Sequence, residues 1–253
     1  MRVSPATYYY RMEQGTAQIG AASSAVDTTT TQLIVTDFLR GAVPAGKDTF
    51  RIQARSESRY TRALSLKDFI LKVEGDLTPF LLRGVIQGER NSRTLQLTTE
   101  TPKRHAATSE YDITGLVFVP TVAPFPLMLG KSPKVGSTLA VGIFDPLSRS
   151  IRNVSLKIEK DSLFTVTDSA TLDSASGHWV KAHEDTVRGW RISGDVPFIT
   201  AWVDESGRMI AASEAGGISL VRTAFEIAFE NWRIDHPAPR GMAAPPPVER
   251  RRR

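Results

Sequence analysis

The sequence predicts a mainly β fold, a large curved antiparallel sheet of half-barrel or sandwich-like form with a short C-terminal helix packed on it. Apolar and polar residues alternate with a period of two in segments such as 49–55 and 93–98, which is typical of strands with one buried face. Short apolar segments recur with glycine-containing turns between them, and a helical pattern appears only near the C-terminus. We therefore expect residues 1–234 to form one antiparallel β domain.

The expected strands follow one another with little else between them, and residue Gly84 is interpreted as a possible β-bulge. Turn residues predict hairpins at 88–92, 173–177 and 204–208, because Asp binds its own backbone at a turn entry and Gly adopts left-handed backbone angles. Trp202, beside the last of these turns, is expected in the core. The predicted strands are 7–12, 35–39, 49–55, 80–86, 93–98, 139–144, 155–159, 164–167, 187–192 and 198–203.

Two regions depart from the strand pattern. Residues 120–133 contain four prolines around an apolar run, which excludes a central strand and predicts a crossover loop with one helical turn at 127–129. A helix is expected over about 223–233, since Thr223 and Glu226 have capping-box spacing. Its apolar stripe, which most simply packs on the sheet and otherwise forms a docking face, consists of Phe225, Ala228, Phe229 and Trp232.

Residues 235–253 are rich in Pro, Ala and Arg and are expected to form a disordered tail. This tail carries much of the formal net charge of +5, so the folded part lacks the basic excess of a nucleic-acid-binding domain and no specific nucleic acid is expected. No apolar stretch is long enough for a transmembrane helix. The N-terminus lacks the apolar region of a secretory signal peptide, which leaves a cytoplasmic location open.

Known catalytic and metal-binding motifs are not recognisable. Cysteine is absent, so thiolate metal sites and cysteine nucleophiles are excluded. His178 and His183 are five residues apart and would point to opposite faces of a strand. We therefore expect no enzyme, no catalytic residue, no metal site and no cofactor. The alternative is an unrecognised hydrolase that uses His183, Glu184 and Asp185 with a serine.

Several short motifs occur in a familiar order: Gly15-x-x-x-Ile19-Gly20, Val135-Gly136, Phe144-Asp145-Pro146 and the segment 201–210 leading into the final helix. This order resembles the β-rich N-terminal module of bacterial transglutaminase-like envelope proteins and related periplasmic curved-sheet domains. The resemblance implies a location in the periplasm or cell envelope. It carries over no activity, because catalysis in that family belongs to a following Cys-His-Asp domain.

The predicted function is a non-catalytic binding or accessory module of a bacterial cell-envelope protein. Its sheet would shelter a lipid or hydrophobic peptide, with the helix closing one side and an exposed apolar flap at 125–129 covering the mouth. The alternative is a structural protein-interaction domain without a ligand pocket, which binds an envelope partner. The oligomeric state is not predicted. The candidate ligand-binding residues are Phe125, Leu127, Met128, Leu129, Phe225, Phe229 and Trp232.

Overall fold

Fifteen strands join in one continuous sheet in the described part of the computed structural model, which covers residues 3–236 except 46, 77, 90–91, 103, 130–131, 147, 195–199 and 214–216. The predicted tail, apart from residues 235 and 236, lies outside these residues. The strands are β1 (Ala6–Gln14), β2 (Ala17–Thr28), β3 (Gln32–Ala45), β4 (Asp48–Thr61), β5 (Leu66–Gly75), β6 (Phe80–Glu89), β7 (Ser92–Thr101), β8 (Arg104–Ile113), β9 (Val117–Phe118), β10 (Thr138–Asp145), β11 (Ser150–Leu172), β12 (Trp179–Ser193), β13 (Thr200–Val203), β14 (Met209–Ser213) and β15 (Ile218–Thr223). The helical segments are α1 (Phe125–Leu129), the π-helical turn η2 (Glu226–Glu230) and α2 (Asn231–Asp235).

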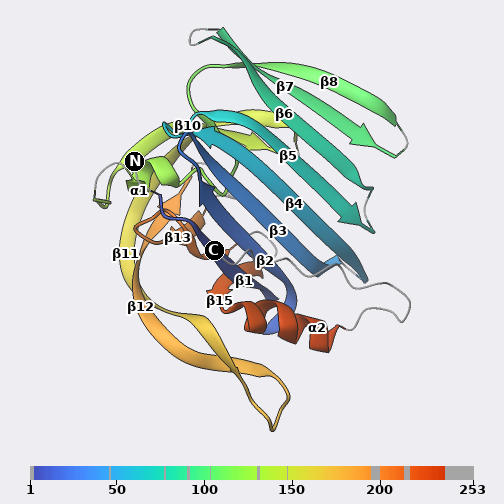
Figure 1. Ribbon diagram of the computed structural model, residues 1–253, viewed down its shortest axis with the longest axis vertical. Helices are drawn as coiled ribbons and strands as arrows, with labels where there is room; N and C mark the ends of the chain where they lie inside the picture. Colours follow the sequence, from blue (N-terminus) through green and yellow to red (C-terminus); the bar gives the residue numbers. More distant parts are fainter. Residues whose placement is uncertain are drawn as a thin grey trace.

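The sheet consists of two runs of sequential strands that meet where β1 pairs with β15. It runs from β8 back to β1, continues through β15, and then runs back from β14 to β9. All neighbours are antiparallel except β9 and β10. The sheet curls strongly, and the long β11–β12 ribbon curves along one side (Figure 1). The mainly β, barrel-like curved sheet with a short C-terminal helix is as predicted.

The main core lies on one face of the sheet, here called the inner face, and the opposite face is called the outer face. Val26, Val35 and Tyr60 mark the inner face and belong to one large cluster of buried apolar residues. Within it, the rings of Tyr60 and Phe118 stack with centroids 6.1 Å apart, and the Tyr60 hydroxyl accepts the backbone N–H of Val119 at 3.1 Å. Buried apolar surface of this kind provides most of the driving force for folding.

Three local predictions were wrong. Gly84 is not a bulge, because it pairs in regular register with Phe69 and Leu97; the Phe69 ring lies over it, and an added Cβ would lie 2.1 Å from that ring. Segments 155–159 and 164–167 belong to one 23-residue strand, β11, whose bulges bend it without ending it. Trp202 is half-buried outside the main core cluster, and its ring packs against Phe164 at 4.7 Å.

The C-terminal helix begins later than predicted. Thr223 is the last residue of β15, and the N-cap residue Phe225 already has helical backbone angles and makes no side-chain cap hydrogen bond. The first turn is π-helical, which rotates the residues that follow relative to an α-helical stripe. Ile227, Ala228 and Trp232 are buried, whereas Phe225, which precedes this turn, is 37% exposed.

Candidate functional site

The seven predicted ligand-binding residues fall into two groups on opposite faces of the sheet. Phe125 and Met128 of α1 are buried in the main core cluster, which also contains Val35 of β3. Phe229 instead contacts Phe38, three residues along β3 and therefore on the outer face. The two groups cannot line one cavity.

The expectation of an exposed apolar flap at 125–129 was wrong. Phe125 is 2% and Met128 3% exposed, and Leu127 and Leu129 are half-buried against the same cluster. The helical turn predicted at 127–129 is present and begins at Phe125. The short helix α1 packs on the inner face of the sheet, so the apolar run of the sequence fills the core and does not cover a pocket.

Four aromatic side chains meet on the outer face and form the aromatic patch (Tyr9, Phe38, Phe225 and Phe229). The Phe225 ring lies 5.2 Å from Tyr9 and 5.3 Å from Phe229, and the Phe229 ring lies 6.1 Å from both Tyr9 and Phe38. Such separations are favourable for aromatic pairs. Phe225 is exposed and the other three are half-buried, so the patch leaves aromatic surface exposed on the outer face.

The helix that carries half of this patch is fixed to strands on both sides of β1 and β15 in the strand order. The Gln18 side chain of β2 donates to the Ala228 carbonyl at 2.8 Å, and the Asn231 amide makes two hydrogen bonds to the backbone of Trp179 in β12. His178 pairs with Asp235 at 3.0 Å. Figure 1 shows η2 and α2 across β1 and β15, away from α1. These contacts hold Phe225 and Phe229 in place without a partner.

Two arginines border the patch on the side of Phe38. Arg55 is the direct neighbour of Phe38 on β4, and Arg40 follows Phe38 by two residues on the same face of β3. Both are exposed, and neither forms an ion pair with any described residue. The aromatic patch therefore has a positively charged border.

A half-buried carboxylate lies on the inner face between three hydroxyl groups. Asp37 accepts hydrogen bonds from Ser24 at 2.7 Å, Thr121 at 2.8 Å and Ser56 at 3.3 Å. Burial raises the pKa of Asp37 above its ordinary value of 3.8, and the three hydroxyls only partly oppose that increase. Because these hydroxyls supply hydrogen bonds to the carboxylate, the arrangement is structural, and the bond from Thr121 joins β3 to the segment before α1.

Replacing Asp37 by Asn should reduce the pH dependence of stability. As the pH rises above about 3.8, the unfolded chain releases this proton before the folded chain does, so Asp37 costs stability up to and through its folded pKa. We expect the melting temperature of Asp37→Asn to fall less than that of the wild type as the pH rises from about 3.8 toward neutrality. Thermal unfolding followed by circular dichroism measures this. Equal slopes for Asp37→Asn and the wild type would contradict the assignment; Asp112→Asn, at an exposed position on β8, is the control.

A second polar cluster joins the two halves of the sheet. Arg222 of β15 is 7% exposed at its side chain, donates to Asp168 of β11 and lies 3.6 Å from Asp204. Its guanidinium carbon lies 3.8 Å from the ring centre of Tyr8, whose hydroxyl accepts from Arg208 at 3.0 Å. Burial raises the pKa of Asp204, and the backbone N–H groups of its turn and the guanidinium of Arg222 oppose the rise. Two cations face two carboxylates here, so the cluster is electrically balanced and structural.

The histidine group considered for a hydrolase does not converge on one point. His183 is exposed and pairs with Asp185 at 3.2 Å, whereas Glu184 pairs with Lys181 at 2.7 Å. His178 contacts Asp235 of the helix. Within the described residues, no three His, Asp or Glu side chains lie close enough together to hold a metal ion.

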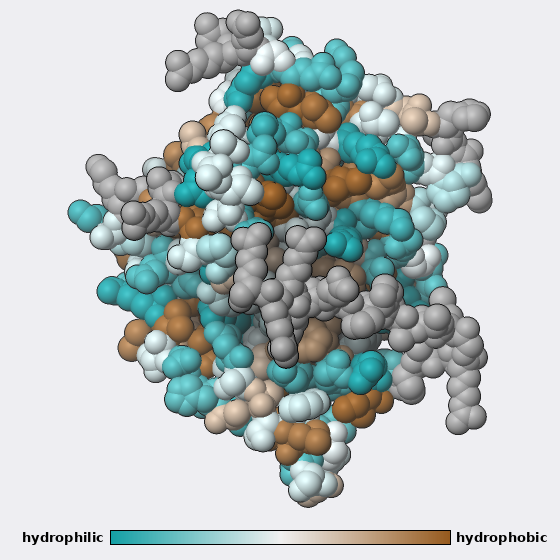
Figure 2. Space-filling model, viewed as in Figure 1, coloured by the Kyte–Doolittle hydropathy of each residue, from teal (hydrophilic) through white to brown (hydrophobic). Residues whose placement is uncertain are grey.

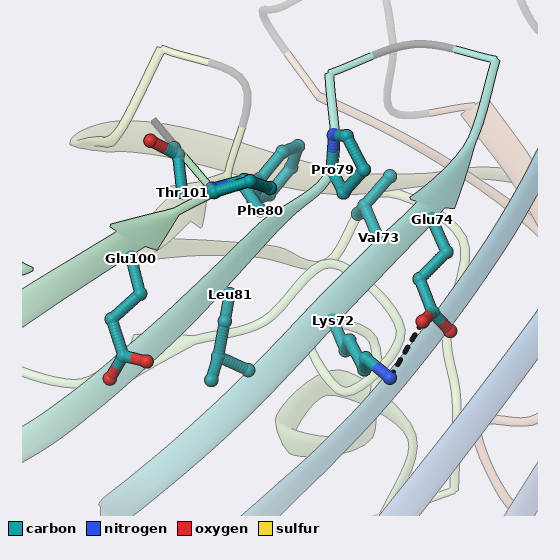
Figure 3. A pocket seen from close by; sticks show the side chains of 9 residues that line it. Lys72, Val73, Glu74, Pro79, Phe80, Leu81, Glu100 and Thr101 are labelled. Carbon is teal, nitrogen blue, oxygen red and sulfur yellow. Dashed lines mark ion pairs between the residues drawn. The ribbon is translucent and has the colours of Figure 1, made fainter. Parts of the chain in front are cut away.

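An open groove of about 260 Å³ lies at the ends of β5, β6 and β7 (Figure 3). Val73, Pro79 and Phe80 form its apolar wall, and the Lys72–Glu74 ion pair, 2.7 Å long, lies at its rim. The groove contains none of the seven predicted residues, and it is smaller than pockets that enclose ligands, about 300–1,000 Å³. It offers no enclosed site.

Comparison with known solved structures shows the fold. No protein-family model matches the chain, and no curated protein matches it. The chain is similar to the crystal structure of a β-barrel-like protein of the domain of unknown function DUF1849 from Brucella abortus, with a TM-score of 0.57 and 14% identity over 87% of this chain and 95% of that chain. A DUF1089 family protein from Pseudomonas aeruginosa has a TM-score of 0.41 and 15% identity over 75% of this chain and 87% of that chain.

The first of these neighbours agrees with the barrel-like curved sheet, and at this level of identity it shows the fold alone. The resemblance to transglutaminase-like envelope proteins is not tested by these comparisons and stays a prediction. In the described part of the chain, no helix is long and apolar enough to cross a membrane.

The sequence alone does not predict the aromatic patch, although its four residues lie in predicted strands and in the predicted helix. Phe225 and Phe229 were selected from the helical stripe, but Trp232 is buried and does not join them. Tyr9 and Phe38 each lie in a predicted strand, and only the register Tyr9–Ser23–Phe38 across β1, β2 and β3 brings them to one face. Apolar residues on both faces of a predicted strand would have been the signal for aromatic residues outside the core.

Proposed function

We propose that this chain is a non-catalytic binding module of a bacterial cell-envelope protein, and that its aromatic patch holds an apolar segment of a protein partner. The observation that carries the proposal is the group of four touching rings on the outer face, with Phe225 exposed at its margin. Aromatic side chains with part of their surface exposed are enriched where proteins bind one another.

The border of the patch supports a partner that combines apolar and acidic side chains. Arg40 and Arg55 lie beside Phe38 without a carboxylate partner among the described residues. An acidic residue of the partner next to its apolar anchor would pair with these two arginines. Such charge pairing improves specificity and association rate. The partner segment is therefore expected to carry Asp or Glu close to an aromatic or aliphatic residue.

The geometry favours a polypeptide over a sheltered lipid. A pocket for a lipid chain must enclose most of its surface, whereas the patch lies on the outer face and is bounded by a single short helix. The inner face near α1 is filled by the core cluster. On the face drawn in Figure 2, hydrophobic side chains form separate groups among hydrophilic ones, which suits local contacts with a protein.

The envelope location and the non-catalytic role do not rest on the aromatic patch. The envelope location rests on the resemblance to envelope modules. The non-catalytic role is supported by the separate, exposed ion pairs of His178 and His183, which converge on no common point. Cell fractionation with an antibody against the chain tests the location: recovery with the periplasm or envelope fraction is expected, and recovery with the cytosol alone would contradict it.

A random peptide library displayed on phage tests the binding role. We expect selection on the full chain to enrich peptides that combine an aromatic or aliphatic residue with Asp or Glu. Phe225→Asp should weaken binding of a synthetic selected peptide by about tenfold or more, and Arg55→Glu by a smaller factor. Leu163→Asp is the matched control, because Leu163 is 70% exposed on β11, away from the patch.

The outcome decides between the proposed surface and its alternatives. Selected peptides that bind Phe225→Asp as tightly as the wild type would show that the patch is not the binding surface. Failure to enrich any peptide, together with saturable binding of a fluorescent fatty acid, would replace the peptide by a lipid. Circular dichroism of each variant distinguishes lost binding from lost folding.

A further inference from the structure

The two edges of the sheet differ in how they are protected. At one end β9 is only two residues long, and both of its residues are buried, with Val117 4% and Phe118 0% exposed. At the other end β8 is a ten-residue edge strand that pairs with β7 on one side. An edge strand presents a row of unpaired N–H and C=O groups and can pair with another chain.

The centre of strand β8, residues 106–109, lacks the charged side chains, proline and bulges that usually protect an exposed edge. Its central residues from Ala106 to Glu110 are all exposed, and most of them are small. The strand contains no proline, and its one irregularity lies at its start, opposite Thr99 to Thr101. A long, regular and accessible edge of this kind is suited to strand pairing.

The charge pattern of β8 identifies the partner. The sequence carries basic residues at and just before the start of the strand, Lys103 and Arg104, and acidic residues near its end, Glu110 and Asp112. In an antiparallel pair of two copies with the two-fold axis at Thr108, the backbone of Arg104 lies opposite that of Asp112. Opposite charges directly across a pair of strands are favourable, and like charges are not.

We propose that a second copy of this chain binds through antiparallel pairing of β8 with β8, centred on Thr108. A two-fold axis at this point makes the contact closed, so the assembly stops at a dimer. A single strand pair buries less surface than the roughly 1,000 Å² of a stable interface, so the dimer should be weak and concentration-dependent. This inference does not depend on the aromatic patch.

Sedimentation equilibrium of the full chain at concentrations from about 5 to about 500 µM tests the proposal. The average mass is expected to rise with concentration toward twice the 27.8 kDa of one chain. Thr108→Lys places two ammonium groups at the two-fold axis and should weaken the dimer by about tenfold or more. Thr98→Lys, on the same face of the neighbouring strand β7 and 3.5 Å from the Thr108 hydroxyl, is the matched control and should leave the dimer unchanged.

A charge exchange tests the register. Asp112→Arg alone should weaken the dimer, and Arg104→Asp combined with Asp112→Arg should restore it, because the exchanged charges again lie opposite one another. A constant mass of one chain at every concentration would overturn the proposal. So would a dimer that Thr108→Lys leaves intact, or an assembly that grows beyond two chains.

Discussion

Phe118→Ala is expected to lower the free energy of unfolding by about 3–5 kcal/mol, the usual cost of emptying a large aromatic site in a core. Phe118 is fully buried, and its ring stacks on Tyr60 with centroids 6.1 Å apart. Strand β9 places it opposite Ile143 of β10. Urea unfolding followed by fluorescence measures the loss.

A conservative replacement tests whether the loss of stability depends on the buried volume that is removed. Phe118→Leu keeps most of the buried volume and should cost clearly less than the alanine variant. If Phe118→Ala lost under about 1 kcal/mol, the site would not be a well-packed core, and the inner face would have to contain free space. That result would also reopen the prediction of a sheltered ligand.

Arg222→Met is expected to cost about 3–5 kcal/mol, because it leaves the buried carboxylate of Asp204 without its ion-pair partner. The side chains of Arg222 and Asp204 are 7% and 9% exposed. Arg222 also stacks on the ring of Tyr8 and pairs with Asp168, so its loss removes this side-chain link between β15 and β11. Thermal or urea unfolding gives the difference.

Two further variants make this prediction specific. Asp204→Asn in the Arg222→Met background removes the unpaired charge and should recover part of the stability. Arg188→Met breaks an ion pair with Asp161 at an exposed position, with Arg188 61% exposed, and should cost only about 0–1 kcal/mol. Equal losses for Arg222→Met and Arg188→Met would contradict the role of the buried cluster.

Much of the fold could be predicted because one physical signal repeats along the chain. Two-residue alternation indicates strands 49–55 and 93–98, and Asp204 and Gly207 indicate a hairpin that the structure closes with the hydrogen bond from the Asp204 N–H to the Arg208 carbonyl. Strand β2 was missed because its small residues, 20–25, show no contrast between the two faces. Gly20 of this strand and Gly41 of β3 have no side chain, and the Met12 side chain lies over both of them.

The candidate site could not be predicted as a whole because it depends on long-range register. The proline-rich run 120–133 and the helical stripe were both apolar, and sequence alone could not tell which of them was core. In the structure Phe125 fills the inner face and Phe225 stays on the outer face. The π-helical turn at Glu226–Glu230 moves the stripe in a way that residue spacing does not reveal.

The central claim is that the outer aromatic patch, and not the interior near α1, is the binding surface. Aromatic ¹H–¹³C NMR of the full chain during titration with the strongest selected peptide tests it most directly. We predict shifts for the rings of Tyr9, Phe38, Phe225 and Phe229, with the buried rings of Phe118 and Phe125 unchanged. Shifts confined to Phe118 and Phe125, or to none of these rings, would contradict it.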